Sequence, residues 1–191
     1  MYPVSDAFLR AVRSNTRKYF WTGTIITKGG MTYEFGAKEI VKGSGYISRQ
    51  CCGSTEIELG MVYAAEMGIT LLSDIDRYTL EDAQVTLVFH LVLADGSVED
   101  VPMGVFEVSE ANRLAKCLEL KAYDFMLRFD KSFNGFETVG TAYDFIALCC
   151  KRCKVEFANK RAEIDAMPNG GVTLSVYTEN DIETCRDMLF Y

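Results

Sequence analysis

The pattern of apolar and polar residues predicts that the first 130 residues are mostly β-structure. Aromatic and β-branched runs at residues 19–27 and 31–35 flank Lys28-Gly29-Gly30 and predict a β-hairpin. The longest β-rich run, residues 83–93, ends at a turn over residues 94–97. These runs predict antiparallel strands joined by tight turns.

Further strands are predicted over residues 46–48, 56–61, 68–72, 105–108 and 116–122. Pro102 is expected to end a brief return strand, and a turn is expected near residues 111–113. Three antiparallel connections in under fifty residues indicate a meander that wraps into a barrel or sandwich.

Helical signals occur at the N-terminus and again after Tyr123. Ser5 and Asp6 can cap a helix over residues 7–13, and a helical turn is expected over residues 124–129. Thr141 and Asp144 resemble a capping box that opens a second helix. Residues 160–166 are expected to form a third helix, and residues 172–177 are expected to form a strand. A last capped helix is expected to begin at residues 178–181. Its apolar side carries Ile182, Cys185, Met188 and Leu189.

These elements predict an α+β fold with two parts. Residues 1–130 form a mostly antiparallel, β-barrel-like domain, and residues 131–191 form a small mixed helical and strand segment. The last helix reaches Tyr191 without a glycine cap and with an unfinished apolar face, so we expect a longer protein.

Composition narrows the classes of function. Of the 191 residues 49% are apolar and 25% charged, which is typical of a foldable globular protein. The sequence contains no apolar window long enough to span a membrane and no basic, apolar signal at its start. A net charge of −7 argues against binding duplex nucleic acid, and the single His90 excludes any site that needs two imidazoles in one subunit.

The charge is unevenly placed along the chain. Between Glu56 and Glu110 there are twelve acidic residues and one basic residue, Arg77. A solvated acidic face explains this excess, and a surface that is acidic for a functional reason is the alternative.

The cysteines are the main candidates for chemistry. Cys150 and Cys153 form a C-x-x-C at the end of a predicted helix, where the helix dipole does not favour a thiolate. With Cys149 and Cys185 they could make a four-sulfur zinc site, although a second C-x-x-C is missing. Without an export signal we expect reduced, buried thiols, and a metal-binding or redox module is kept as the alternative.

Other motifs point to no catalytic site. Glu56 with Glu58, and Asp74 with Asp76, place carboxylates two residues apart, but they lack the regular spacing of a calcium loop. Residues 28–30 and 43–45 match no phosphate-binding loop. His90 lies mid-strand among apolar residues, which favours a packed side chain, so no enzyme, cofactor or small-molecule substrate is predicted.

Several strings of residues resemble one known family of proteins. They are Tyr2-Pro3-Val4-Ser5-Asp6-Ala7-Phe8, Arg13-Ser14-Asn15-Thr16-Arg17, Trp21-Thr22-Gly23, Ile40-Val41-Lys42-Gly43-Ser44-Gly45-Tyr46-Ile47, Glu56-Ile57-Glu58-Leu59-Gly60 and Tyr123-Asp124-Phe125-Met126-Leu127-Arg128-Phe129-Asp130-Lys131. Over nearly the whole chain, the sequence resembles minor tail proteins of the tail-tip (baseplate) hub of long-tailed phages and prophages of Gram-positive bacteria.

The resemblance implies a structural protein. Such hubs look like β-barrel tube domains with small α/β insertions, assembled as trimers below the tail tube. It implies a homotrimer that contacts other tail proteins, is made in the bacterial host cytoplasm and is located at the virion tail tip. It also implies a channel through which DNA passes without specific binding, and an acidic wall would repel the DNA phosphates.

Overall fold

The computed structural model describes residues 2–50 and 63–191. The predicted strand over residues 56–61 and the candidates Glu56 and Glu58 lie outside the described residues. The chain divides into two compact units. The first consists of residues up to Arg49 together with Ala65–Asp124, and the second contains Phe125–Tyr191.

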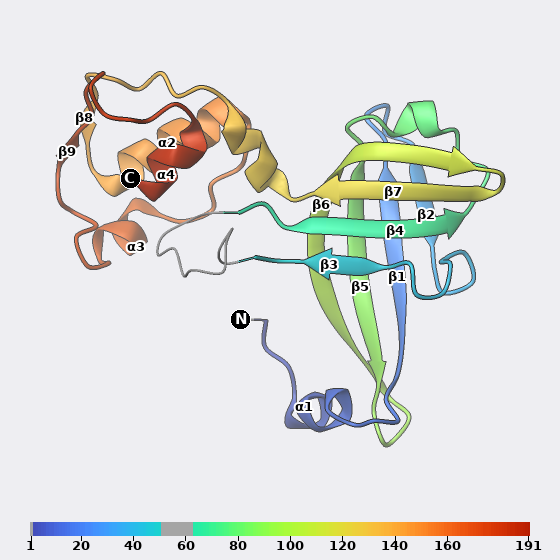
Figure 1. The fold of residues 1–191 in the computed structure, drawn as a ribbon. Helices are drawn as coiled ribbons and strands as arrows, with labels where there is room; N and C mark the ends of the chain where they lie inside the picture. Colours follow the sequence, from blue (N-terminus) through green and yellow to red (C-terminus); the bar gives the residue numbers. More distant parts are fainter. Residues whose placement is uncertain (1, 51–62) are drawn as a thin grey trace. The chain divides into compact units, whose positions relative to one another are not determined.

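The first unit is one seven-stranded antiparallel sheet (Figure 1). Its strands are β1 (Lys18–Ile26), β2 (Thr32–Phe35), β3 (Tyr46–Ser48), β4 (Glu66–Leu72), β5 (Gln84–Val92), β6 (Val98–Leu114) and β7 (Cys117–Tyr123). Their order across the sheet is β2-β1-β5-β6-β7-β4-β3. The predicted hairpin is therefore confirmed as β1 and β2, and the predicted meander is confirmed as β5, β6 and β7.

Strand β6 connects the two halves of the sheet, which are β2, β1 and β5 on one side and β7, β4 and β3 on the other. Its first part pairs with β5 and its last part with β7, and the register shifts once in each ladder. Such bulges bend a strand and increase its twist. The two halves of the sheet therefore face each other across a shared interior.

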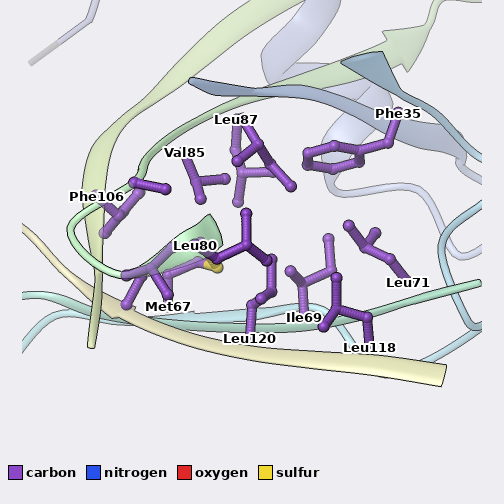
Figure 2. Packing of buried hydrophobic residues seen from close by; sticks show 14 of the residues in the cluster. Phe35, Met67, Ile69, Leu71, Leu80, Val85, Leu87, Phe106, Leu118 and Leu120 are labelled. Carbon is purple, nitrogen blue, oxygen red and sulfur yellow. The ribbon is translucent and has the colours of Figure 1, made fainter. Parts of the chain in front are cut away.

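That interior is the core of the first unit. Val85 and Leu87 of β5 and Phe35 of β2 point into this core. They pack in one cluster with Met67 and Ile69 of β4 (Figure 2). Alternation along the strands explains this set, because every second residue of a strand points to the same face.

The α+β prediction is confirmed, whereas the barrel is confirmed only as a curled antiparallel sheet. Strands β2 and β3 are the two ends of the sheet, and no strand pairing closes it among residues 2–50 and 63–191. Residues after β2 approach the other half, since Val41 N donates to Thr70 O and Leu72 N donates to Glu39 O. The curl is therefore nearly complete, but the sheet does not close into a barrel in the described chain.

Two expectations for β6 were wrong. The strand continues through Pro102 and includes residues 111–113; the turn follows at Ala115, where φ is +52°. Proline is tolerated because this part of β6 pairs only with β5, next to the bulge between Pro102 and Gly104. On the side of β6 away from β5, no strand of the described residues pairs with this part of β6 and requires the missing N–H.

Two helices of the molecule follow their sequence signals closely. Helix α1 (Asp6–Val12) is capped by Ser5, whose Oγ accepts from Phe8 N at 3.0 Å. Helix α2 (Ala142–Cys153) opens at Thr141, whose N–H donates to Asp144 Oδ2 at 2.8 Å. Both predicted caps are therefore confirmed.

The second unit packs its helices around a separate core. It contains α2, α3 (Arg161–Asp165), α4 (Cys185–Phe190), a 3-10 turn at Phe125–Asp130 and the short pair β8 (Val139–Gly140) and β9 (Leu174–Ser175). The last helix begins after Thr184, later than predicted, because Asp187 accepts from Thr184 N at 2.8 Å and sets the cap there. The predicted strand over residues 172–177 is correspondingly reduced to β9.

The cap of α2 predicts a specific acid sensitivity of the second unit. The Arg161 guanidinium, together with the Thr141 N–H, lowers the pKa of Asp144 to about 2. Because the unfolded carboxyl has a pKa of about 4, the stability from this contact is present above pH 4 and is lost as the pH falls towards 2. Urea unfolding followed by helical circular dichroism should show that the difference between wild type and Asp144→Asn shrinks over that interval.

The control for this prediction is Asp181→Asn, which changes an exposed carboxylate of the same unit. Its difference from the wild type should remain small and constant. An Asp144→Asn difference that is unchanged from pH 5 to pH 2 would contradict the role given to the contact with Arg161.

Candidate functional site

The most distinct candidate site is a groove in the first unit, which we call the seam groove. It has a volume of about 540 Å³ and lies between the first half of β1 and residues 37–47. Its floor includes Ile69 of β4 and Leu87 of β5, which belong to the core. The groove therefore lies where the curled sheet fails to close.

The strand lengths explain why the groove is open. Strand β2 pairs only with residues 23–26 of β1, whereas β5 pairs with β1 along its whole length. On the side away from β5, residues 18–22 of β1 thus have no strand partner in the described chain. Strand β3 on the opposite side is an end strand of the sheet. Two unpaired backbone edges border the groove as a result.

Tyr46 and Ser44 hold the wall that carries β3. The Tyr46 ring covers Gly68 of β4 so closely that a Cβ at Gly68 would lie 2.2 Å from the ring. Its hydroxyl donates to Glu66 Oε1 at 2.5 Å, a contact that lowers the pKa of Glu66. Ser44 Oγ donates to Val41 O at 2.7 Å and accepts from Thr70 N at 3.1 Å. These contacts fix the wall against β4.

The rim of the groove is basic although the chain as a whole is acidic. Arg17, Lys18 and Lys42 line it and are exposed. None of the three forms an ion pair within the described part of the chain. Tyr19 and Tyr46 also line the groove and are about half exposed, at 52% and 48%. An apolar floor, aromatic walls and free cations favour a partner that is both apolar and acidic.

A second candidate is a polar cluster on the outer face of β1, β5 and β6. Thr22 Oγ1 lies 2.7 Å from His90 Nε2, and His90 Nδ1 lies 2.6 Å from Asp100 Oδ1. Phe20 stacks on the imidazole with the ring centroids 4.5 Å apart. Hydroxyl, imidazole and carboxylate are thus aligned in the order of nucleophile, base and orienting acid.

Chemically this cluster could move a proton from Thr22 to His90. The same contacts join neighbouring strands, since His90 is the register partner of both Phe20 and Asp100. Cross-strand pairs of this kind stabilise a sheet. The sequence pointed to a packed His90 but gave no sign of Thr22 or Asp100 as its partners, because the register of three strands determines them.

The fold brings the candidate cysteines into the core of the second unit. Cys149, Cys150 and Cys153 lie on α2 and Cys185 begins α4, and all four are buried free thiols. Burial, together with the neighbouring Cys185, raises the pKa of Cys149 and raises that of Cys153 to about 11. Cys149 and Cys153 therefore stay protonated at neutral pH, which lowers their reactivity as nucleophiles and ligands.

No group of three or more His, Cys, Asp or Glu side chains is arranged to hold a metal ion among the described residues. The zinc or redox alternative, with Cys149, Cys150, Cys153 and Cys185 as its residues, therefore stays a prediction. Elemental analysis of the purified chain tests it, because a structural zinc site would retain about one metal ion per chain.

The burial of these four thiols predicts slow chemical labelling. In the folded chain, an aromatic disulfide reagent should modify them at least about tenfold more slowly than after unfolding in urea, because the fold covers their sulfur atoms. Mass mapping of the labelled peptides gives the rate for each cysteine. Half-buried Cys117 of β7 is the internal control and should react faster. Fast labelling of Cys149 in the folded chain would contradict this packing.

The acidic residues occupy several parts of the first unit. Asp76 accepts from Tyr78 N at 3.0 Å and caps a 3-10 turn, so it acts in a solvated loop. Asp82 precedes β5 and Asp95 follows it, at opposite ends of that strand. The described acidic residues are therefore spread along the sheet.

Comparisons with known proteins give limited information. No protein-family model and no curated protein matches the sequence. A solved structure described as the virion of a native gene transfer agent particle contains a chain to which this one is similar, with 12% identity and a TM-score of 0.45. The similarity covers 70% of this chain and 49% of that chain, so this chain spans about half its length. The similarity is weak, and the description of the solved structure names a virion without naming a tail tip.

No helix within the described residues is long and apolar enough to cross a membrane.

Proposed function

We propose that this chain is a structural component of the tail-tip or baseplate hub of a long-tailed phage or prophage of Gram-positive bacteria. In this role it joins the tail tube to the central spike or fibre and acts without catalysis. The observation that supports the proposal most is the resemblance of residues 2–8, 40–47 and 123–131 to minor tail proteins. The curled antiparallel sheet of the first unit agrees with the tube-type domains that this resemblance implies.

The proposal includes assembly with other copies and with other tail proteins. A homotrimer at the virion tail tip is the expected state. The two end strands of the sheet, β2 and β3, offer backbone groups for contacts between chains. Assembly through such contacts would add backbone pairing at the ends of the sheet, outside the core cluster, whose residues all belong to one chain.

The proposal also includes a channel for DNA. Exposed carboxylates such as Asp74, Glu81 and Glu110 would repel the phosphates of a passing genome, so that the DNA moves without binding. Replacing all three with lysine in the phage should slow DNA ejection. A matched triple replacement of exposed acids in the second unit, Glu156, Asp165 and Glu179, is the control. Equal ejection rates for the two triple variants would remove the channel from the proposal.

The structural role itself is tested by a stop codon early in the gene of the phage that encodes the chain. We expect particles without a complete tail tip and a loss of infectivity, both restored by supplying the chain from a plasmid. Electron microscopy and plaque counts measure these outcomes. Particles with normal tails and full infectivity would contradict the proposal.

A further inference from the structure

The seam groove is about as long as a short strand, and unpaired edges of β1 and β3 border it. Residues 18–21 of β1 form one of its borders. The stretch of β1 that β2 leaves unpaired, residues 18–22, extends over roughly 16 Å at about 3.3 Å per residue. The end strand β3 approaches the opposite border. Backbone N–H and C=O groups along such edges pair with an added strand in many recognition complexes.

The interior of the groove selects apolar side chains. Trp21 and Ile47 pack against the core from the two walls, and Ile69 and Leu87 below them are almost fully buried. In an added strand every second side chain would point towards these residues. Those positions would therefore be apolar in the partner.

The rim selects the intervening side chains by charge. The Arg17 guanidinium donates weakly from Nη1 to Val12 O at 3.5 Å. Arg17, Lys18 and Lys42 have no ion-pair partner in the described ranges. Exposed cations around an apolar site attract acidic segments and repel basic ones. The outward positions of a bound strand would therefore be acidic.

We propose that the seam groove binds an extended segment of a partner protein, in which apolar and acidic residues alternate, by adding it as a strand to the free edge of β1. A lipid-like anion would satisfy the apolar floor and the cations but would leave the backbone edges unpaired. The extended peptide matches all three features. This proposal does not depend on the phage function.

The experiment uses Trp21, the only tryptophan of the chain, as a reporter inside the groove. The probe is a nine-residue peptide that alternates glutamate and valine. Its addition should change the tryptophan emission in a saturable way. A peptide with lysine in place of glutamate, and one with a central proline, should bind at least about tenfold more weakly, because they lose the charge match or the ladder.

Variants locate the binding site. The double variant Lys18→Glu and Lys42→Glu should weaken binding of the acidic peptide at least about tenfold and strengthen that of the lysine peptide. Lys116→Glu, at an exposed residue outside the groove, is the control and should bind like the wild type. Circular dichroism should show that all variants remain folded.

Hydrogen exchange distinguishes strand addition from loose contact. Bound peptide should slow exchange of backbone amides within residues 18–22, whereas the paired part of β1 should change little. Equal binding of the proline peptide, or saturable binding of dodecanoate without any binding of the acidic peptide, would overturn the proposal. The same is true if Lys116→Glu weakens binding as much as the double variant.

Discussion

Replacing Phe106 with alanine is expected to destabilise the first unit by about 3–5 kcal/mol. Phe106 is 1% exposed and lies on β6 opposite Val85, inside the core between the two halves of the sheet. Truncation would remove its apolar contacts and leave a cavity that the bent strand cannot easily close. The effect is therefore expected to be among the largest of any single core change.

Urea unfolding monitored by Trp21 emission measures this loss, because the only tryptophan lies in the first unit and packs against its core. The matched control is Val105→Ala, the neighbouring residue, which is 38% exposed. Its cost should stay under about 1 kcal/mol. A loss below about 1 kcal/mol for Phe106→Ala would contradict the packing of the two halves against each other.

Replacing Gly23 with alanine is expected to cost about 2–3 kcal/mol through overpacking. A Cβ at this position would lie 2.3 Å from the Phe35 ring and 2.6 Å from the backbone oxygen of Thr86. The ring could move, but Thr86 belongs to β5, which pairs with β1 along its whole length. The ladder therefore has to distort to admit one methyl group.

Gly29→Ala provides the matched control in the adjoining turn, because its Cβ would meet only Thr27 Oγ1 at 3.8 Å. The same tryptophan-monitored unfolding should show a much smaller change for this variant. Equal stabilities of the two alanine variants would show that β1 and β5 do not approach each other as closely as described.

Local signals in the sequence predicted the elements whose causes are local. The hairpin turn at residues 28–30 and the caps of α1 and α2 depend on residues within a few positions of each other. Pro102 misled the prediction because its tolerance depends on which neighbours pair with β6, and these are set by distant strands. The start of α4 was misplaced because two adjacent segments offer capping residues and Asp187 satisfies only the later one.

The candidate sites depended even more on long-range pairing. The sequence already grouped Cys149, Cys150, Cys153 and Cys185, and the fold places all four in the core of the second unit. The partners of His90 and the walls of the seam groove come from strands far apart in sequence. The extent of β2 leaves part of β1 unpaired, and no local motif encodes that extent.

The most direct test of the proposed hub role is cryo-electron microscopy of the phage or prophage particles that the proposal expects to contain the chain. The account predicts copies of the seven-stranded sheet arranged around the tail axis at the tip, with exposed acids such as Asp74 and Glu81 facing a central channel. A fully traced tail tip that does not contain this chain would contradict it.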